Sequence, residues 1–157
     1  MTSKYKEIFT EVITVDKADY DNVQYQMTAE EFIKTELKNH LDFLYIDFDD
    51  EGCPGKELRL FFEKIKGVKK EPFIISITGT SLNRLADHSY SKLRKYPSSD
   101  YYRYNKLLSR FMEDICEANG FTCTEIFNKR REQGTTVYAS YKIEETGMQC
   151  KGTNGLS

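Results

Sequence analysis

Two apolar runs joined by an amphipathic segment constrain the fold of this chain more than any other feature of its sequence. The runs are Leu41–Phe48 (LDFLYIDF) and Phe73–Thr78 (FIISIT), and both have the length and composition of strands buried on both faces of a sheet. The segment between them carries four apolar residues at helical spacing: Leu58, Phe61, Phe62 and Ile65. Strand, helix and strand in this order predict a parallel pair with a right-handed crossover.

A second helix and two further strands are predicted downstream. Tyr101–Asn119 carries apolar residues at helical spacing and is followed by Gly120, where the helix is expected to end. Phe121–Phe127 has a strand composition, and Thr136–Ile143 alternates between apolar and polar residues. The charged connection between these two segments predicts an antiparallel pair.

The first forty residues predict a smaller set of elements. Glu11–Asp16 and Val23–Met27 have the composition of short strands. Thr28 and Glu31 have the spacing of a capping box, which predicts a helix that begins after Thr28 and ends near His40. Residues 1–143 are therefore expected to form a single domain, and residues 144–157 a polar, disordered tail.

Composition narrows the class of protein. The chain has 157 residues and a net charge of −2, so it is not a simple basic nucleic-acid binder. No apolar run is as long as the roughly 20 residues that a membrane helix needs, and no apolar signal core opens the chain, so a cytoplasmic protein is expected. The scattered cysteines and two histidines predict reduced thiols and no metal site.

The order of these elements resembles the C-terminal part of a class I S-adenosylmethionine-dependent methyltransferase. The segments that carry the resemblance are FLYIDFDDEGCP, EPFIISITGT and NGFTCTEIF with TTVYASYKI. Phe43–Phe48 resembles the fourth strand of that family and Phe73–Thr78 the fifth. The resemblance implies an α/β, Rossmann-like methyltransferase-type fold whose mixed sheet is mostly parallel with an antiparallel C-terminal strand pair. It also implies S-adenosylmethionine as the cofactor.

The N-terminal part departs from the family, because no glycine precedes Gly52 and the Gly-rich cofactor loop is therefore missing. In one alignment Asp16 matches the acid that binds the cofactor ribose, and the chain is N-terminally shortened. In the other, Glu11–Asp16 is a degenerate first strand. The first is preferred because Val23–Phe32 resembles the third strand and its turn. Thr28 and Ala29 then occupy the positions at which the family contacts the adenine amino group. A partner chain or a homo-oligomer is expected to complete the sheet.

Asp47 and Asp49 are the candidate catalytic residues. Both close a predicted central strand, and ligands bind at the carboxyl ends of parallel strands. The resemblance implies that they lie beside the transferred methyl group and bind or deprotonate an acceptor amine. A looser resemblance joins Asp47, Asp49, Gly52 and Pro54 to the Asp-x-Asp-Pro-aromatic-Gly-x-Pro stretch of tRNA guanine-N2 methyltransferases. The alternative is a solvated acidic turn.

A basic, tyrosine-rich stretch follows the fifth strand of the resemblance. From Thr80 to Arg110 there are 7 basic and 2 acidic side chains. Cations neutralise phosphates and tyrosines stack on bases, which predicts contact with nucleic acid. The alternative is a solvated helix face. The candidate substrate-binding residues are Arg84, Lys92, Arg94, Lys95, Tyr101 and Arg103.

Two functions of different classes remain open from the sequence. The first is methyl transfer from S-adenosylmethionine to an acceptor that includes nucleic acid. The second is a non-enzymatic protein that binds nucleic acid or a protein partner on a degenerate version of the same fold.

Overall fold

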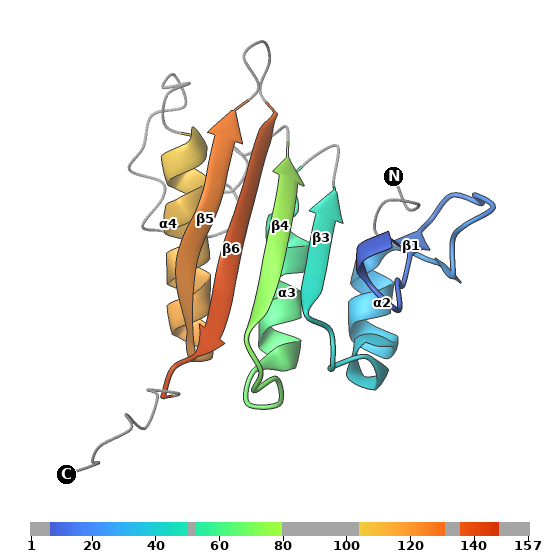
Figure 1. Ribbon diagram of the computed structural model, residues 1–157, viewed down its shortest axis with the longest axis horizontal. Coiled ribbons are helices and arrows are strands. Elements are labelled where there is room, and N and C mark those ends of the chain that lie inside the picture. The colour runs from blue at the N-terminus through green and yellow to red at the C-terminus, as the bar shows by residue number, and fades with distance from the viewer. Residues whose placement is uncertain (1–6, 50–52, 80–103, 131–135, 148–157) are drawn as a thin grey trace. The chain divides into compact units, whose positions relative to one another are not determined.

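The computed structural model describes residues 7–49, 53–79, 104–130 and 136–147, which belong to two compact units, Met1–His40 and Leu41–Ser157 (Figure 1). The first unit holds β1 (Val15–Asp16), β2 (Tyr25–Gln26), α2 (Ala29–Thr35) and the 3-10 helix η1 (Leu37–Asn39). The second holds β3 (Tyr45–Asp49), α3 (Gly55–Ile65), β4 (Phe73–Gly79), α4 (Tyr104–Asn119), β5 (Phe121–Arg130) and β6 (Val137–Glu145). That residues 1–143 form a single domain stays a prediction.

The second unit is built on a four-stranded mixed sheet with the strand order β3-β4-β6-β5 (Figure 1). β3 and β4 pair in parallel, whereas β6 pairs antiparallel with β4 on one side and with β5 on the other. Both predicted strand pairs are therefore confirmed. The expected mostly parallel sheet needs correction, because the insertion of β6 leaves one parallel contact in this sheet. β3, β4 and β5 nevertheless run in the same direction.

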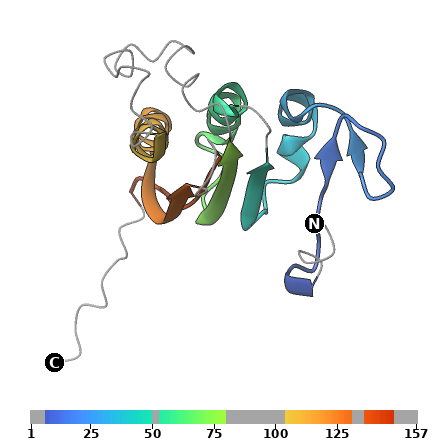
Figure 2. The same ribbon diagram turned by 90° about the horizontal axis from the view of Figure 1, so that it is seen from above.

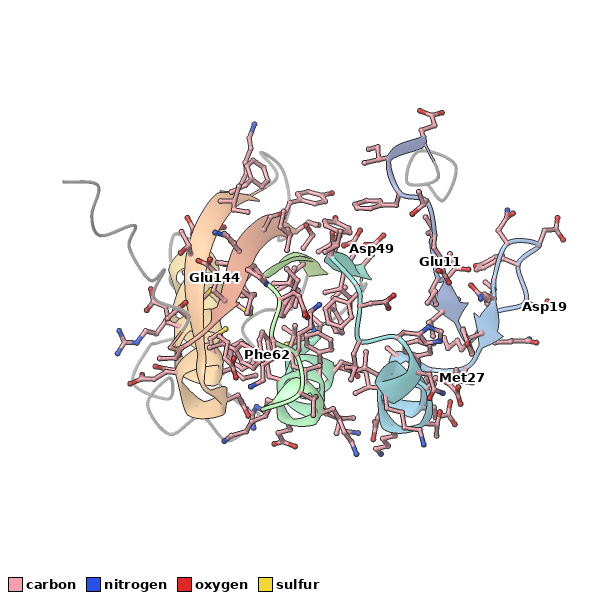
Figure 3. The ribbon with its side chains drawn as sticks, turned by 60° about the horizontal axis from the view of Figure 1, so that its bottom comes forward. Glu11, Asp19, Met27, Asp49, Phe62 and Glu144 are labelled. Carbon is pink, nitrogen blue, oxygen red and sulfur yellow. The ribbon has the colours of Figure 1, made fainter. Side chains whose placement is uncertain are left out.

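Helices α3 and α4 lie on the same face of this sheet (Figure 2). The alternation predicted for the last strand is confirmed, since Val137, Ala139, Tyr141 and Ile143 are each at most 2% exposed. The face of the sheet opposite to α3 and α4, called the opposite face below, carries the intervening side chains. On it Tyr138 is 43% exposed. A buried aromatic cluster centred on Phe61 fills the space between α3 and the sheet, where Phe62 also lies (Figure 3).

Glycines end both helices of the second unit. Gly67 follows α3 and Gly120 follows α4, with φ of 73° and 81°. This left-handed conformation is strained for other residues, so glycine is favoured at both positions.

Three strand boundaries differ from the sequence prediction. β3 begins at Tyr45, because the chain before it turns and leaves Leu44 64% exposed. β5 extends to Arg130 and β6 to Glu145, because backbone pairing between them continues past the apolar residues. A ladder depends on main-chain groups, so polar side chains are tolerated. The predicted tail therefore does not begin at Glu144, and residues 148–157 lie outside the described residues.

The strands of the first unit are shorter than predicted. β1 and β2 are two residues long each and form a parallel pair of their own. The Thr14 hydroxyl contacts the backbone of Asn22 and Gln24, so a side chain takes over part of the pairing. A small cluster fixes β2 to the helical segment, in which the Tyr25 hydroxyl lies 2.9 Å from Nε2 of His40 and the Phe32 ring stacks on His40.

The capping box at the start of α2 is confirmed. The Thr28 hydroxyl accepts a hydrogen bond from the Glu31 N–H at 3.2 Å, and Glu31 Oε2 accepts one from the Thr28 N–H at 2.9 Å. The Thr28 N–H and, second in size, the Thr28 hydroxyl donate to the Glu31 carboxylate and lower the pKa of Glu31. Satisfying the free N–H groups of the first turn stabilises the helix.

Replacing this cap is expected to destabilise the first unit. Thr28→Ala should lower the free energy of unfolding by about 1 kcal/mol, and Thr28→Ser should preserve it. The lowered pKa of Glu31 favours its charged form. The contribution of the Glu31 carboxylate to the free energy of unfolding is therefore present above pH 4.5, the ordinary pKa, and is lost as the pH falls through the folded-state pKa. Urea denaturation followed by circular dichroism at pH 7 and pH 3 measures this. If the parent and Thr28→Ala differed in free energy of unfolding by the same amount at both pH values, the role of Glu31 would be contradicted.

Candidate functional site

Asp47 and Asp49 lie on the same face of β3, Asp47 at its middle position and Asp49 at its carboxyl end. Asp47 is half-buried and Asp49 is exposed at the last position of the strand (Figure 3). In the parallel register Asp47 is opposite Ser76 of β4, and Asp49 is opposite Thr78. The predicted position at the carboxyl end of a parallel strand is met by Asp49, whereas Asp47 lies at the middle of β3. The predicted central strand is wrong for the described sheet, because β3 is an edge strand in the order β3-β4-β6-β5. Their catalytic role stays a prediction.

Hydroxyl groups continue this polar site across the sheet. Ser140 of β6 is opposite Ser76, and the two hydroxyl oxygens lie 2.6 Å apart. Tyr138 is opposite Thr78 one row nearer the strand ends. The site thus joins two carboxylates to three hydroxyl groups and a tyrosine on the opposite face.

Sequence reasoning missed Ser140 and Tyr138. The alternation in Thr136–Ile143 places both on the face away from the core, so their face was predictable. Their neighbours were not, because pairing between β4 and β6 joins segments about 60 residues apart, and the alternation alone fixes no register.

The candidate cofactor residues lie in the first unit, and most of their polar groups cap local structure. Asp16 ends β1, and its Oδ1 accepts a hydrogen bond from the Ala18 N–H at 2.8 Å. The Thr28 hydroxyl donates to Glu31 Oε2 at 2.8 Å and accepts from the Glu31 N–H. Ala29 is the first residue of α2. Because these residues and Asp47 belong to different units, the shared crevice that would join Asp16 with Asp47 stays a prediction.

The candidate substrate-binding residues fall outside the described residues. Arg84, Lys92, Arg94, Lys95, Tyr101 and Arg103 all lie between residues 80 and 103. Within the described ranges, no three histidine, cysteine or acidic side chains gather as a metal site requires. In the same ranges no helix has the length and apolarity to cross a bilayer.

Two groups with raised pKa values, Tyr141 and Cys116, lie on the helix-covered side of the second unit. Burial raises the pKa of the Tyr141 hydroxyl, and a hydrogen bond with Cys123, together with burial, raises that of the Cys116 thiol. Ser109 of α4 lies 3.4 Å from the Tyr141 hydroxyl and accepts a hydrogen bond from the Asn128 side chain at 2.9 Å. These contacts join α4 to β5 and β6, so their role is in packing.

Comparison with known proteins supports the fold class. Neither a protein-family model nor a curated protein matches the sequence. Among solved structures the chain is similar to Trm1 from Pyrococcus horikoshii in complex with S-adenosyl-L-methionine, with a TM-score of 0.55 and 19% identity. The similarity covers 77% of this chain and 32% of that chain, so this chain spans about a third of the length of that protein. The likeness shows a shared fold: mixed α/β with a mixed sheet.

Proposed function

We propose that this protein transfers a methyl group from S-adenosylmethionine to nucleic acid at the carboxyl ends of β3 and β4. The observation that carries the proposal is the placement of Asp47 and Asp49 at that edge, on a fold similar to that of a protein solved with S-adenosyl-L-methionine. Open α/β sheets bind ligands at this edge, because parallel strands deliver their ends to one side.

The roles of the two acids follow from their exposure. Asp47, half-buried and opposite Ser76 of β4, suits a group that orients or deprotonates the acceptor amine. Asp49, exposed at the strand end, suits contact with the substrate as it enters. The cofactor, when bound, supplies the electrophilic methyl group. Methyl transfer depends mainly on alignment of donor and acceptor, so few diagnostic side chains are needed.

The first unit fits the cofactor in part. The Asp16 carboxylate ends a strand of a parallel pair, a position from which it can accept hydrogen bonds from ribose hydroxyls. Thr28 does not suit the adenine, because its hydroxyl both donates and accepts within the capping box. Among the described residues β3 pairs with β4 alone, and we propose that a strand from a partner chain or a second copy pairs with its other edge.

Calorimetry with S-adenosylmethionine and S-adenosylhomocysteine tests this proposal. The parent protein should bind both, and Asp16→Asn should weaken binding by about 1–3 kcal/mol, the range for losing a charged hydrogen-bond partner. Asp19→Asn is the matched control, because Asp19 is an exposed acid of the loop that follows β1.

A non-enzymatic binding protein is the second candidate function. The commitment of Asp16 and Thr28 to local caps favours it. If the parent protein binds neither compound at millimolar concentration, the methyl-transfer proposal fails and this candidate replaces it.

A further inference from the structure

An irregularity in β5 brings an aromatic side chain to the opposite face of the sheet. Glu125 is paired with Tyr141, but the next paired residue is Phe127, opposite Ser140, so Ile126 is an inserted residue. Without this bulge Phe127 would be opposite Ala139 and would face α4, because side chains alternate between faces. Bulges that redirect a side chain are frequent beside functional sites.

The bulge places Phe127 next to Tyr138. Phe127 is 47% exposed and Tyr138 is 43% exposed, although both are large rings that cores readily bury. Tyr138 is two residues before Ser140, the partner of Phe127, so the two rings are diagonal neighbours on one face. Diagonal neighbours in an antiparallel pair are about 7–8 Å apart, which is within reach of aromatic side chains.

A lysine completes this patch. Lys129 is directly opposite Tyr138, and no carboxylate pairs with it among the residues that the structure describes. Lys142 of β6, by contrast, forms an ion pair with Glu144, whose Oε1 lies 2.8 Å from its Nζ. The patch formed by Phe127, Lys129 and Tyr138, called the aromatic platform below, thus combines two exposed rings with one available positive charge.

We propose that the aromatic platform binds bases of single-stranded nucleic acid, and that this strand leads to Asp47 and Asp49. Aromatic side chains on an open sheet face stack on unpaired bases, and a lysine beside them contacts the phosphates. The path of the bound strand from the platform to Asp47 and Asp49 rests on the proposed function. The inference narrows the substrate class to unpaired nucleotides.

The separation across the sheet fits this arrangement. Asp49, Thr78, Tyr138 and Lys129 occupy one row from β3 to β5. Three strand spacings make this row about 14 Å long. One nucleotide can therefore lie on the aromatic platform while another on the same strand lies beside the carboxylates. The acids repel phosphates and accept hydrogen bonds from base amino groups, whereas Lys129 attracts phosphates.

Fluorescence anisotropy with labelled single-stranded RNA of mixed sequence tests the aromatic platform. Phe127→Ala and Tyr138→Ala should each weaken binding by about 5- to 150-fold, the usual value of one stacked base. Tyr138→Phe keeps the ring and should bind as the parent does. Lys129→Glu should weaken binding and reduce the slope of log K against log salt by about 0.7, the contribution of one phosphate contact on a single strand. Val68→Ala, at an apolar side chain that is 54% exposed between α3 and β4, is the control.

The outcomes separate this inference from the function on which it rests. Failure to bind the RNA, or equal affinity of the parent and the Phe127→Ala/Tyr138→Ala double variant, overturns the platform whether or not the cofactor binds. RNA binding that depends on both rings supports it even if calorimetry shows no cofactor binding. A parent that sediments as a dimer, becomes a monomer in the double variant and binds no RNA would show a protein interface instead.

Discussion

Asp47→Asn is expected to lower the rate of methyl transfer by about 10²- to 10⁴-fold while leaving the affinity for S-adenosylmethionine unchanged. This decrease in rate is the one expected for loss of a general acid–base group, since an amide cannot accept the proton that a carboxylate accepts. The cofactor affinity should not change, because Asp47 is proposed to act on the acceptor. Transfer of a tritiated methyl group from S-adenosylmethionine to total cellular RNA measures the rate, and calorimetry measures the affinity.

The control for this variant is Asp42→Asn. Asp42 is an exposed acid just before β3, at the other end of the strand from Asp49. Its replacement makes the same change in charge away from the carboxyl edge, so the transfer rate should stay near that of the parent. Equal rates for the two variants would show that Asp47 has no part in the reaction.

Phe61→Ala is expected to lower the free energy of unfolding of the second unit by about 3–5 kcal/mol. Phe61 is 0% exposed, and its ring lies 5.6 Å from that of Phe48, 5.4 Å from that of Phe62 and 6.0 Å from that of Phe73. The substitution removes apolar area and leaves a cavity among the remaining rings. Since whole domains are stable by roughly 5–15 kcal/mol, this loss is a large fraction of the total.

Urea denaturation followed by circular dichroism measures this loss, and Phe127→Ala is the matched control. It removes the same atoms from a side chain that is 47% exposed, so the expected loss is about 1 kcal/mol, well below that of Phe61→Ala. Similar losses for the two variants would mean that the cluster around Phe61 is not the centre of the core.

The second unit was predictable largely because its apolar pattern is strong. Continuous apolar runs identified β3 and β4, helical spacing identified α3, and alternation identified the buried face of β6. Helical spacing and alternation reflect which side chains are removed from water. The continuous runs overstated burial, because β3 and β4 were expected to be buried on both faces and Ile74 of β4 is 38% exposed. The first unit was less predictable, because β1 and β2 pair over two residues each, and turn contacts such as those of Thr14 decide where the strands end.

The candidate site was predictable at one strand only. Asp47 and Asp49 were identified from their place at the end of an apolar run. Ser140 and Phe127 were not, because their positions depend on register. For Phe127 the alternation within β5 would have pointed the ring into the core, and a single inserted residue reverses this.

The insertion of β6 between β4 and β5 has a consequence for the order in which the fold can form during synthesis. β6 is the last of the described strands along the chain, yet it lies between β4 and β5 and pairs with both of them. A nascent chain that has emerged only as far as β5 has its β3–α3–β4 portion and its α4–β5 portion unconnected by any strand pairing. Emergence of β6 from the ribosome, rather than synthesis of the helices, is therefore the event that joins them into one sheet.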